Sequence, residues 1–152
     1  MESINNHLRS LSEDAYEHLK GKLKIGVQWD SEVTISPNRH LVTQVYCSAL
    51  PVAYSNIERE LWRDFAKLIL EATYEATLFV ALQNYEKTKN AKVYLTLVGG
   101  GAFGNEEEWI LNALKKSIRK FSNTPLDIKI VSYGASSRAI QQFIDSLKNK
   151  KY

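Results

Sequence analysis

The feature that most constrains this chain is a glycine-rich turn set between a short apolar run and an amphipathic segment. Val93–Val98 is apolar but too short for a helix, which predicts an interior β-strand covered on both faces. Glu106–Phe121 carries apolar side chains at helical spacing and gathers its basic residues in the last turns. Asn105 stands at the N-cap position, with Glu108 three residues later as in a capping box. A strand, a tight turn and a helix in this order are typical of α/β folds.

The rest of the chain repeats this alternation of strand and helix patterns. Strands are predicted where apolar and polar residues alternate or β-branched residues gather, at 23–29, 32–35, 41–50 and 128–133. Helices are predicted where apolar residues recur every three or four positions, at 5–19, at 57–85 and after a serine cap at 136 or 137. Strands and helices in this order imply crossover connections, with helices on both faces of a sheet. We therefore predict one α/β domain over residues 1–152, with an N-terminal helical segment at 1–21.

The long helical segment at 57–85 carries two stripes. One is apolar and consists of Trp62, Phe65, Ile69, Ala72, Ala76 and Phe79. The other is charged and consists of Glu60, Asp64, Lys67, Glu71 and Glu75. The residues after Glu75 are uncharged, so this half of the helix is expected to be buried on more than one side. Glu75 is then either the end of a solvated stripe or a carboxylate with a raised pKa that serves as an acid or base.

Composition excludes several classes of protein. The chain has 20 basic and 17 acidic residues, spread along its length, which give a formal net charge of +3. Its one cysteine forms no internal disulfide and, with three scattered histidines, offers no zinc spacing, so we expect no metal. No apolar run approaches the ~20 residues of a membrane span, and the N-terminus lacks a secretory pattern. We expect a cytoplasmic protein without a cofactor or a membrane partner. The lysines at 148–151 fit a basic helix end better than a nucleic-acid site.

Gly99, Gly101 and Gly104 form a G-x-G-x-x-G pattern between the predicted strand and helix. Such a turn can bring main-chain N–H groups close to an anion, or it can be a compact corner that needs positive φ. Three glutamates at 106–108 already complement the helix dipole and would have to point away from a bound anion. A dinucleotide-binding fold is excluded, because Asp127 lies at the start of the next strand and the acidic partner should lie at its end.

The segment Val98-Gly-Gly-Gly-Ala-Phe-Gly104 resembles the diphosphate-binding loop of the macro domain, an ADP-ribose-binding α/β module. The resemblance implies a three-layer α/β/α arrangement around a mixed sheet. It also implies that the diphosphate is held by Gly99, Gly100, Gly101, Ala102, Gly104 and Asn105. By the same resemblance, Phe103 covers the distal ribose.

Other segments extend the resemblance to most of the chain. Val27–Val33 is similar to the family's first strand, which implies that Asp30 reads the adenine amino group. Val45–Pro51 is similar to the strand that enters the first ligand loop, which places Ser48 and Ala49 among the ligand-binding residues. Tyr133 follows the last strand, where an aromatic side chain can flank the adenine.

The chain departs from the family at the end of that second strand. The family carries Asn-Ala-Ala-Asn there, whereas this chain has Cys47-Ser-Ala-Leu50, followed by Pro51–Asn56 in place of a glycine-rich loop. The departure weighs more against hydrolysis of ADP-ribosyl bonds than against binding. Several segments also resemble a divergent macro-like group that includes a bacterial effector acting on ADP-ribosylated arginine.

The expected function is therefore binding of ADP-ribose, of an ADP-ribosylated protein or of a related nucleotide diphosphate. If the chain also hydrolyses an ADP-ribosyl linkage, the candidate carboxylates are Asp30, Glu32 and Glu75. One alternative is a catalytically dead macro-like fold used as a protein-interaction or structural module. Another is an enzyme that acts on a different nucleotide.

Overall fold

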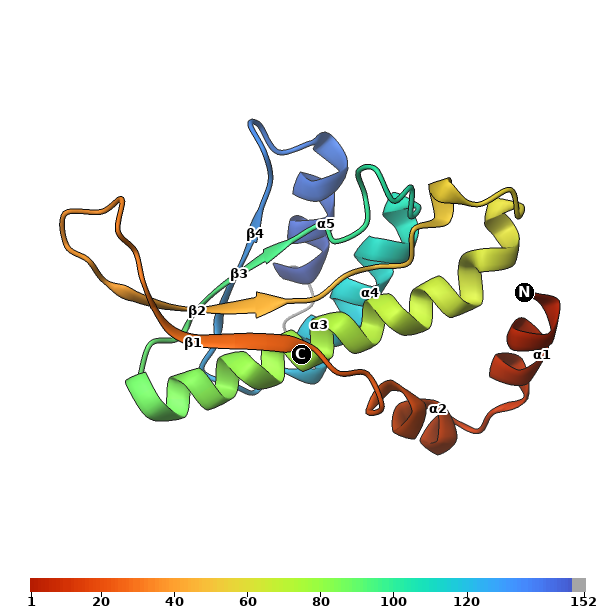
Figure 1. Ribbon diagram of the computed structural model, residues 1–152, viewed down its shortest axis with the longest axis horizontal. Helices are drawn as coiled ribbons and strands as arrows, with labels where there is room; N and C mark the ends of the chain where they lie inside the picture. The colour runs from red at the N-terminus through yellow and green to blue at the C-terminus, as the bar shows by residue number, and fades with distance from the viewer. Residues whose placement is uncertain (149–152) are drawn as a thin grey trace.

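The structure is a computed structural model that describes residues 1–148, so most of the basic tail lies outside the described residues. Figure 1 shows α3 running the length of the molecule, with the other elements arranged around it. The elements in chain order are α1 (Glu2–Ser10), α2 (Glu13–Lys20), β1 (Gly26–Glu32), β2 (Leu41–Tyr46), η1 (Val52–Tyr54), η2 (Arg59–Trp62), α3 (Arg63–Thr88), β3 (Lys92–Thr96), α4 (Glu107–Lys120), β4 (Asp127–Val131) and α5 (Arg138–Lys148).

The strands form two separate pairs. β1 and β2 are an antiparallel hairpin with a register shift between Gln28 and Ser31, and β3 and β4 are parallel neighbours joined by α4. The parallel pair with its helical crossover confirms the α/β class. In the described residues β2 and β3 are not hydrogen-bonded to each other, so no continuous mixed sheet joins the two pairs.

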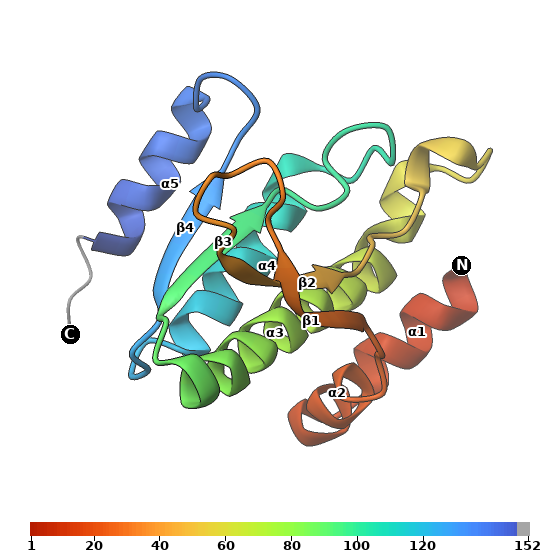
Figure 2. The ribbon, with the colours of Figure 1, turned by 60° about the vertical axis from the view of Figure 1, so that its left-hand side comes forward.

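α3 is the centre of the core. Its fully buried residues Leu70, Tyr74 and Leu78 pack in one cluster with residues of β3, α4 and α5. Helices α1, α2 and α4 and strand β2 all contact α3. In its second half Leu78 and Val80 are buried but Phe79 is exposed, so the expected burial on more than one side holds only in part. Figure 2 shows the hairpin and the β3–β4 pair on the same side of this helix. No helix among residues 1–148 has the length and apolar character needed to cross a membrane.

Several element boundaries differ from the sequence-based prediction. The N-terminal segment is two helices, because the Ser12 side chain accepts a hydrogen bond from the Ala15 N–H at 3.2 Å and starts α2 anew. Residues 33–40 form the hairpin loop and not a further strand. Lys89, at φ 60°, ends α3 in the left-handed conformation. The predicted serine cap is confirmed at Ser137, whose hydroxyl accepts from the Ile140 N–H at 3.3 Å.

Two predictions beside the glycine turn were wrong. β3 is not covered on both faces, since its burial alternates along the strand and only Val93 and Leu95 are buried. Asn105 is not a helix cap: α4 begins at Glu107 with Glu106 at the N-cap position, and no side chain caps it. The Asn105 carboxamide is turned instead into the loop, where it bonds main-chain carbonyls.

The two stripes of α3 are also buried differently from the expectation. Glu71 and Glu75 in the charged stripe are buried, whereas Phe79 in the apolar stripe is 53% exposed. The reason is that α2 and α4 cover the charged stripe and bring lysines to it. The Phe79 ring makes a T-shaped contact with the Phe121 ring, with ring centroids 4.9 Å apart.

Candidate functional site

The glycine loop, residues 97–106, connects the end of β3 to the start of α4. Gly99 and Gly104 have φ values of +83° and +67°, which L-residues rarely adopt. A Cβ on Gly104 would lie 2.7 Å from the Cβ of Ala53, and a Cβ on Gly99 would clash with Ala49. These two glycines are therefore required by the turn and by its close packing on the preceding segment.

Part of the loop is closed by internal hydrogen bonds. The N–H of Gly104 donates to the Gly101 carbonyl at 3.0 Å, and the N–H of Asn105 donates to the Gly99 carbonyl at 3.0 Å. The Asn105 side chain is buried and donates to the carbonyl of Leu50 at 2.8 Å. Gly100 also donates internally. These N–H groups already donate hydrogen bonds within the loop and are not available to an anion.

The tip of the loop differs from its base. The N–H groups of Gly101, Ala102 and Phe103 donate no hydrogen bond within residues 1–148. Gly101 and Ala102 are exposed, and a Cβ built on Gly101 would meet no atom within 4 Å. Three consecutive N–H groups thus remain unpaired at an open turn, an arrangement that can bind the oxygens of an anion.

The segment that follows β2 packs against this loop through Ala49. Ala49 is buried against Gly99, and η1 begins three residues later. The Ala53 N–H donates to the Phe103 carbonyl at 2.9 Å, and the Phe103 ring meets the Tyr54 ring edge-on with centroids 5.8 Å apart. Tyr54 is 69% exposed, so η1 places a second aromatic side chain beside the loop, one that the sequence analysis missed. Its only signal in the sequence is its place in the segment that replaces the family's glycine-rich loop.

A cation also lies beside the loop. The Arg59 Nη1 atom is 2.6 Å from Glu106 Oε1, and both side chains are about half exposed. Arg59 therefore offsets one of the three carboxylates at the start of α4, which would otherwise repel an anion at the loop.

Asp30 lies in a different part of the molecule. It has φ 54° at the irregularity in β1 and lines a cavity of about 510 Å³ between β2, β3 and α3. The neighbouring Trp29 ring lies 3.9 Å from Lys87 Nζ, near the C-terminal end of α3.

The distance of Asp30 from the glycine loop follows from the contacts along α3. β2 runs antiparallel to α3, since Thr43 bonds Asn84 at 2.8 Å and Ser48 accepts from Thr73 at 3.4 Å. The loop lies at the Tyr74 end, where the Tyr74 hydroxyl bonds the end of β3. From Tyr74 to Lys87 the helix rises about 20 Å at ~1.5 Å per residue. The structure therefore does not bring Asp30 to the glycine loop.

Tyr133 follows β4 and lies at the same end of the parallel pair as the loop, because Thr96 of β3 is aligned with Val131 of β4. Its side chain is fully exposed. Glu32 lies on the hairpin, where it pairs with Arg39.

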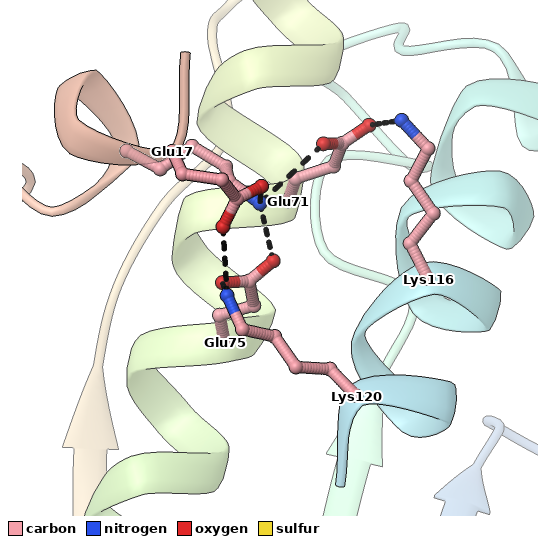
Figure 3. Close-up of polar contacts among 6 residues, drawn as sticks. Glu17, Glu71, Glu75, Lys116 and Lys120 are labelled. Carbon is pink, nitrogen blue, oxygen red and sulfur yellow. Dashed lines mark hydrogen bonds and ion pairs between the residues drawn. The ribbon is translucent and has the colours of Figure 1, made fainter. Parts of the chain in front are cut away.

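Glu75 belongs to an ion cluster that sequence analysis did not anticipate. The cluster consists of Glu17, Lys20, Glu71, Glu75, Lys116 and Lys120. Figure 3 shows the two α3 glutamates facing the two α4 lysines. Lys20 from α2 lies 2.5 Å from Glu75 and has only 5% of its side chain exposed. In the sequence this cluster is indicated by two pairs of residues with i,i+4 spacing, Glu71 and Glu75 in α3 and Lys116 and Lys120 in α4.

The cluster leaves Glu75 little freedom to act as an acid or base. Its two carboxylate oxygens bind Lys20 at 2.5 Å and Lys120 at 2.7 Å. Burial alone would lower the pKa of Lys20, but hydrogen bonds to Glu17 and Glu75 outweigh it and raise that pKa. Lys20 therefore stays charged in the folded protein and holds the carboxylate as an ion pair. The described residues contain no group of three or more His, Cys, Asp or Glu side chains placed to hold a metal.

Comparisons of this chain with protein-family models, with curated proteins and with solved structures gave no match. The function is therefore argued from the residues and the geometry of this chain.

Proposed function

We propose that this protein binds the diphosphate of ADP-ribose, or of a related nucleotide, at the tip of the glycine loop. The observation that carries the proposal is the run of three unpaired N–H groups at Gly101, Ala102 and Phe103, at the exposed tip of the loop. A diphosphate offers several oxygen acceptors, and main-chain N–H groups in a turn are suited to bind them.

The surroundings of the loop support a nucleotide over a bare anion. Phe103 and the exposed Tyr54 provide an aromatic surface beside the N–H groups, on which a ribose or base can pack. Arg59 neutralises the Glu106 carboxylate at the same loop, which would otherwise repel the diphosphate. Tyr133, at the same end of the β3–β4 pair as the loop, is a third aromatic group, which we propose to flank the base.

The proposal is one of binding and assigns no hydrolytic residue. Glu75 is held between two lysines. The helix rises about 20 Å from Tyr74, at the loop, to Lys87, which contacts the Trp29 ring next to Asp30. Neither carboxylate is placed to position a water molecule at a ribose whose diphosphate lies at Gly101. An adenine-reading role for Asp30 would need a ligand that spans this distance.

Calorimetric titration and thermal unfolding with ADP-ribose test the proposal. A ligand present at 100 times its Kd adds about 2.7 kcal/mol to folding stability, or a rise in Tm of about 5–11 °C for a chain of this size. Gly101→Glu should abolish the heat and the Tm shift and leave the fold intact, because the new side chain enters open space. Asn123→Glu, which adds the same charge in an exposed turn, should bind normally.

ADP, AMP, NAD and pyrophosphate belong in the same series. Binding of ADP and pyrophosphate but not of AMP would show that the diphosphate is the recognised group. If millimolar ADP-ribose gave no heat and no change in Tm, or if Gly101→Glu bound as tightly as the unmodified protein, the proposal would be rejected.

A further inference from the structure

The cavity between the two strand pairs is a groove whose floor is α3, and we call it the α3 groove. One of its walls is unusual, because all five consecutive residues of β3, Lys92–Thr96, line it. Successive side chains of a strand point to opposite faces, so a single face can line a cavity only with alternate residues. The groove therefore faces the edge of β3, where the main chain is accessible. β4 occupies the other edge.

The two ends of this edge are satisfied from outside the sheet. The Lys92 N–H donates to the Asn90 side chain at 3.1 Å, and the Thr96 carbonyl accepts from the Tyr74 hydroxyl at 2.9 Å. Main-chain groups two residues apart point to the same side of a strand. Tyr94, midway between them, therefore directs its N–H and carbonyl into the groove, and neither has a partner there within residues 1–148. An unpaired strand edge of this kind is a template for another strand.

The floor of the groove sets the length of its occupant. Tyr74 and Thr88 mark its ends on α3, and the helix rises about 21 Å between them. An extended chain covers this length with about six residues at ~3.3 Å each.

The charge of the lining sets the occupant's composition. Along the length of the groove the side chains are uncharged, as at Thr43, Cys47, Thr77 and Ala81. Its charged lining residues, Asp30 and Lys92, lie at the end of the groove that Thr88 marks. A charged side chain placed in the middle would lose its hydration without gaining a partner, and this cost favours a neutral segment.

We propose that the α3 groove binds an extended, uncharged peptide segment of about six residues, which pairs with β3 as an added strand. This inference is independent of nucleotide binding, because the groove and the tip of the glycine loop use different residues.

Fluorescence anisotropy with the full chain and labelled hexapeptides tests the pairing. The probe is a fluorescein-labelled pool whose positions are drawn from threonine, valine and serine, with two companion pools N-methylated at odd or at even positions. We expect saturable binding of the parent pool. One methylation pattern should abolish binding and the other should preserve it, because only one edge of the peptide faces β3. A lysine at the third position should weaken binding by about tenfold.

Cys47, the single cysteine of the chain, reports whether the peptide occupies the groove. Burial raises the pKa of the Cys47 thiol, so its alkylation by iodoacetamide is followed at mildly alkaline pH. The peptide should slow this reaction. Ala81→Trp, which fills the floor, should abolish peptide binding, and Gln83→Trp, on an exposed position of the same helix, should not.

Two results would overturn the inference. One is an absence of saturable binding at millimolar protein, or equal binding of both methylated pools. The other is concentration-dependent dimerisation in sedimentation that protects Cys47 without peptide, which would make a second copy of the chain the occupant. Neither result bears on the ADP-ribose titration, so the two proposals fail separately.

Discussion

Replacing Lys20 by methionine should destabilise the protein strongly, although the side chain is not part of the proposed site. Lys20 has 5% of its side chain exposed, and its ammonium group lies 2.5 Å from Glu17, 2.5 Å from Glu75 and 3.8 Å from Glu71. Removing one partner of a buried ion pair costs about 3–5 kcal/mol, because a charge is left buried without compensation. Here Lys116 still neutralises Glu71 and Lys120 still neutralises Glu75. We therefore expect a loss of about 2–3 kcal/mol, below that range.

Urea unfolding and thermal melts measure this loss. The expected fall in Tm is about 4–12 °C for a chain of this length. Arg39→Met is the matched control, since its pair with Glu32 has side chains that are 70% and 43% exposed, and it should change stability by less than about 1 kcal/mol. Adding Glu75→Gln to Lys20→Met should cost less than the two single losses summed, because the two groups interact directly. If Lys20→Met were as mild as the control, or if the double variant were additive, the ion cluster would not be what holds α2 on α3.

Three further outcomes follow from the geometry. Hydrogen bonds from Lys120 and Lys20 outweigh burial and lower the pKa of Glu17 below its ordinary 4.5, whereas the pKa of Lys20 is raised above 10.5. Stability against urea should therefore be level between these two values; it should fall below pH 4.5 as Glu17 is protonated and fall again above pH 10.5 as Lys20 loses its proton. Gly99→Ala should destabilise the protein by about 2–5 kcal/mol, because φ is +83° and the new Cβ would clash. Gly101→Ala should change stability by no more than about 0.5 kcal/mol. Chemical denaturation of the two variants measures both losses, and equal losses would contradict this expectation. Tyr74→Phe should cost about 1–3 kcal/mol by leaving the end of β3 without its hydroxyl partner, and an unchanged Tm would show that water replaces it.

The parts of the fold that follow from local pattern were predictable from the sequence. The apolar spacing of α4 and the alternation of β1 identify these elements, and the glycines mark the turn between β3 and α4. The pairing of strands was not predictable in this way, because it depends on contacts between distant segments. The same limit applies to the burial of Glu71 and Glu75, since a charged stripe is typical of a solvated face until a helix from elsewhere brings lysines to it.

The candidate site shows the same division. The resemblance placed Ser48, Ala49 and the glycine loop together, and the structure packs Ala49 against Gly99. The resemblance did not show which N–H groups of the loop are hydrogen-bonded internally. In the sequence Asn105 looks like a helix cap, but in the structure its side chain donates to the Leu50 carbonyl. Asp30 was linked to the loop only by analogy, and its distance is set by the antiparallel course of β2 along α3. Tyr54 and Arg59 had no recognisable motif and became candidates only when η1 and η2 were seen beside the loop.

The most direct test of the central claim is an amide-resolved NMR titration with ADP-ribose, repeated with inorganic pyrophosphate. The N–H signals of Gly101, Ala102 and Phe103 should shift together and saturate with both ligands, whereas the internally bonded Gly104 and Asn105 should move little. If those three signals stay unmoved while the ligand binds elsewhere, or if no signal of the loop shifts, the turn is a compact corner and the proposed diphosphate site does not exist.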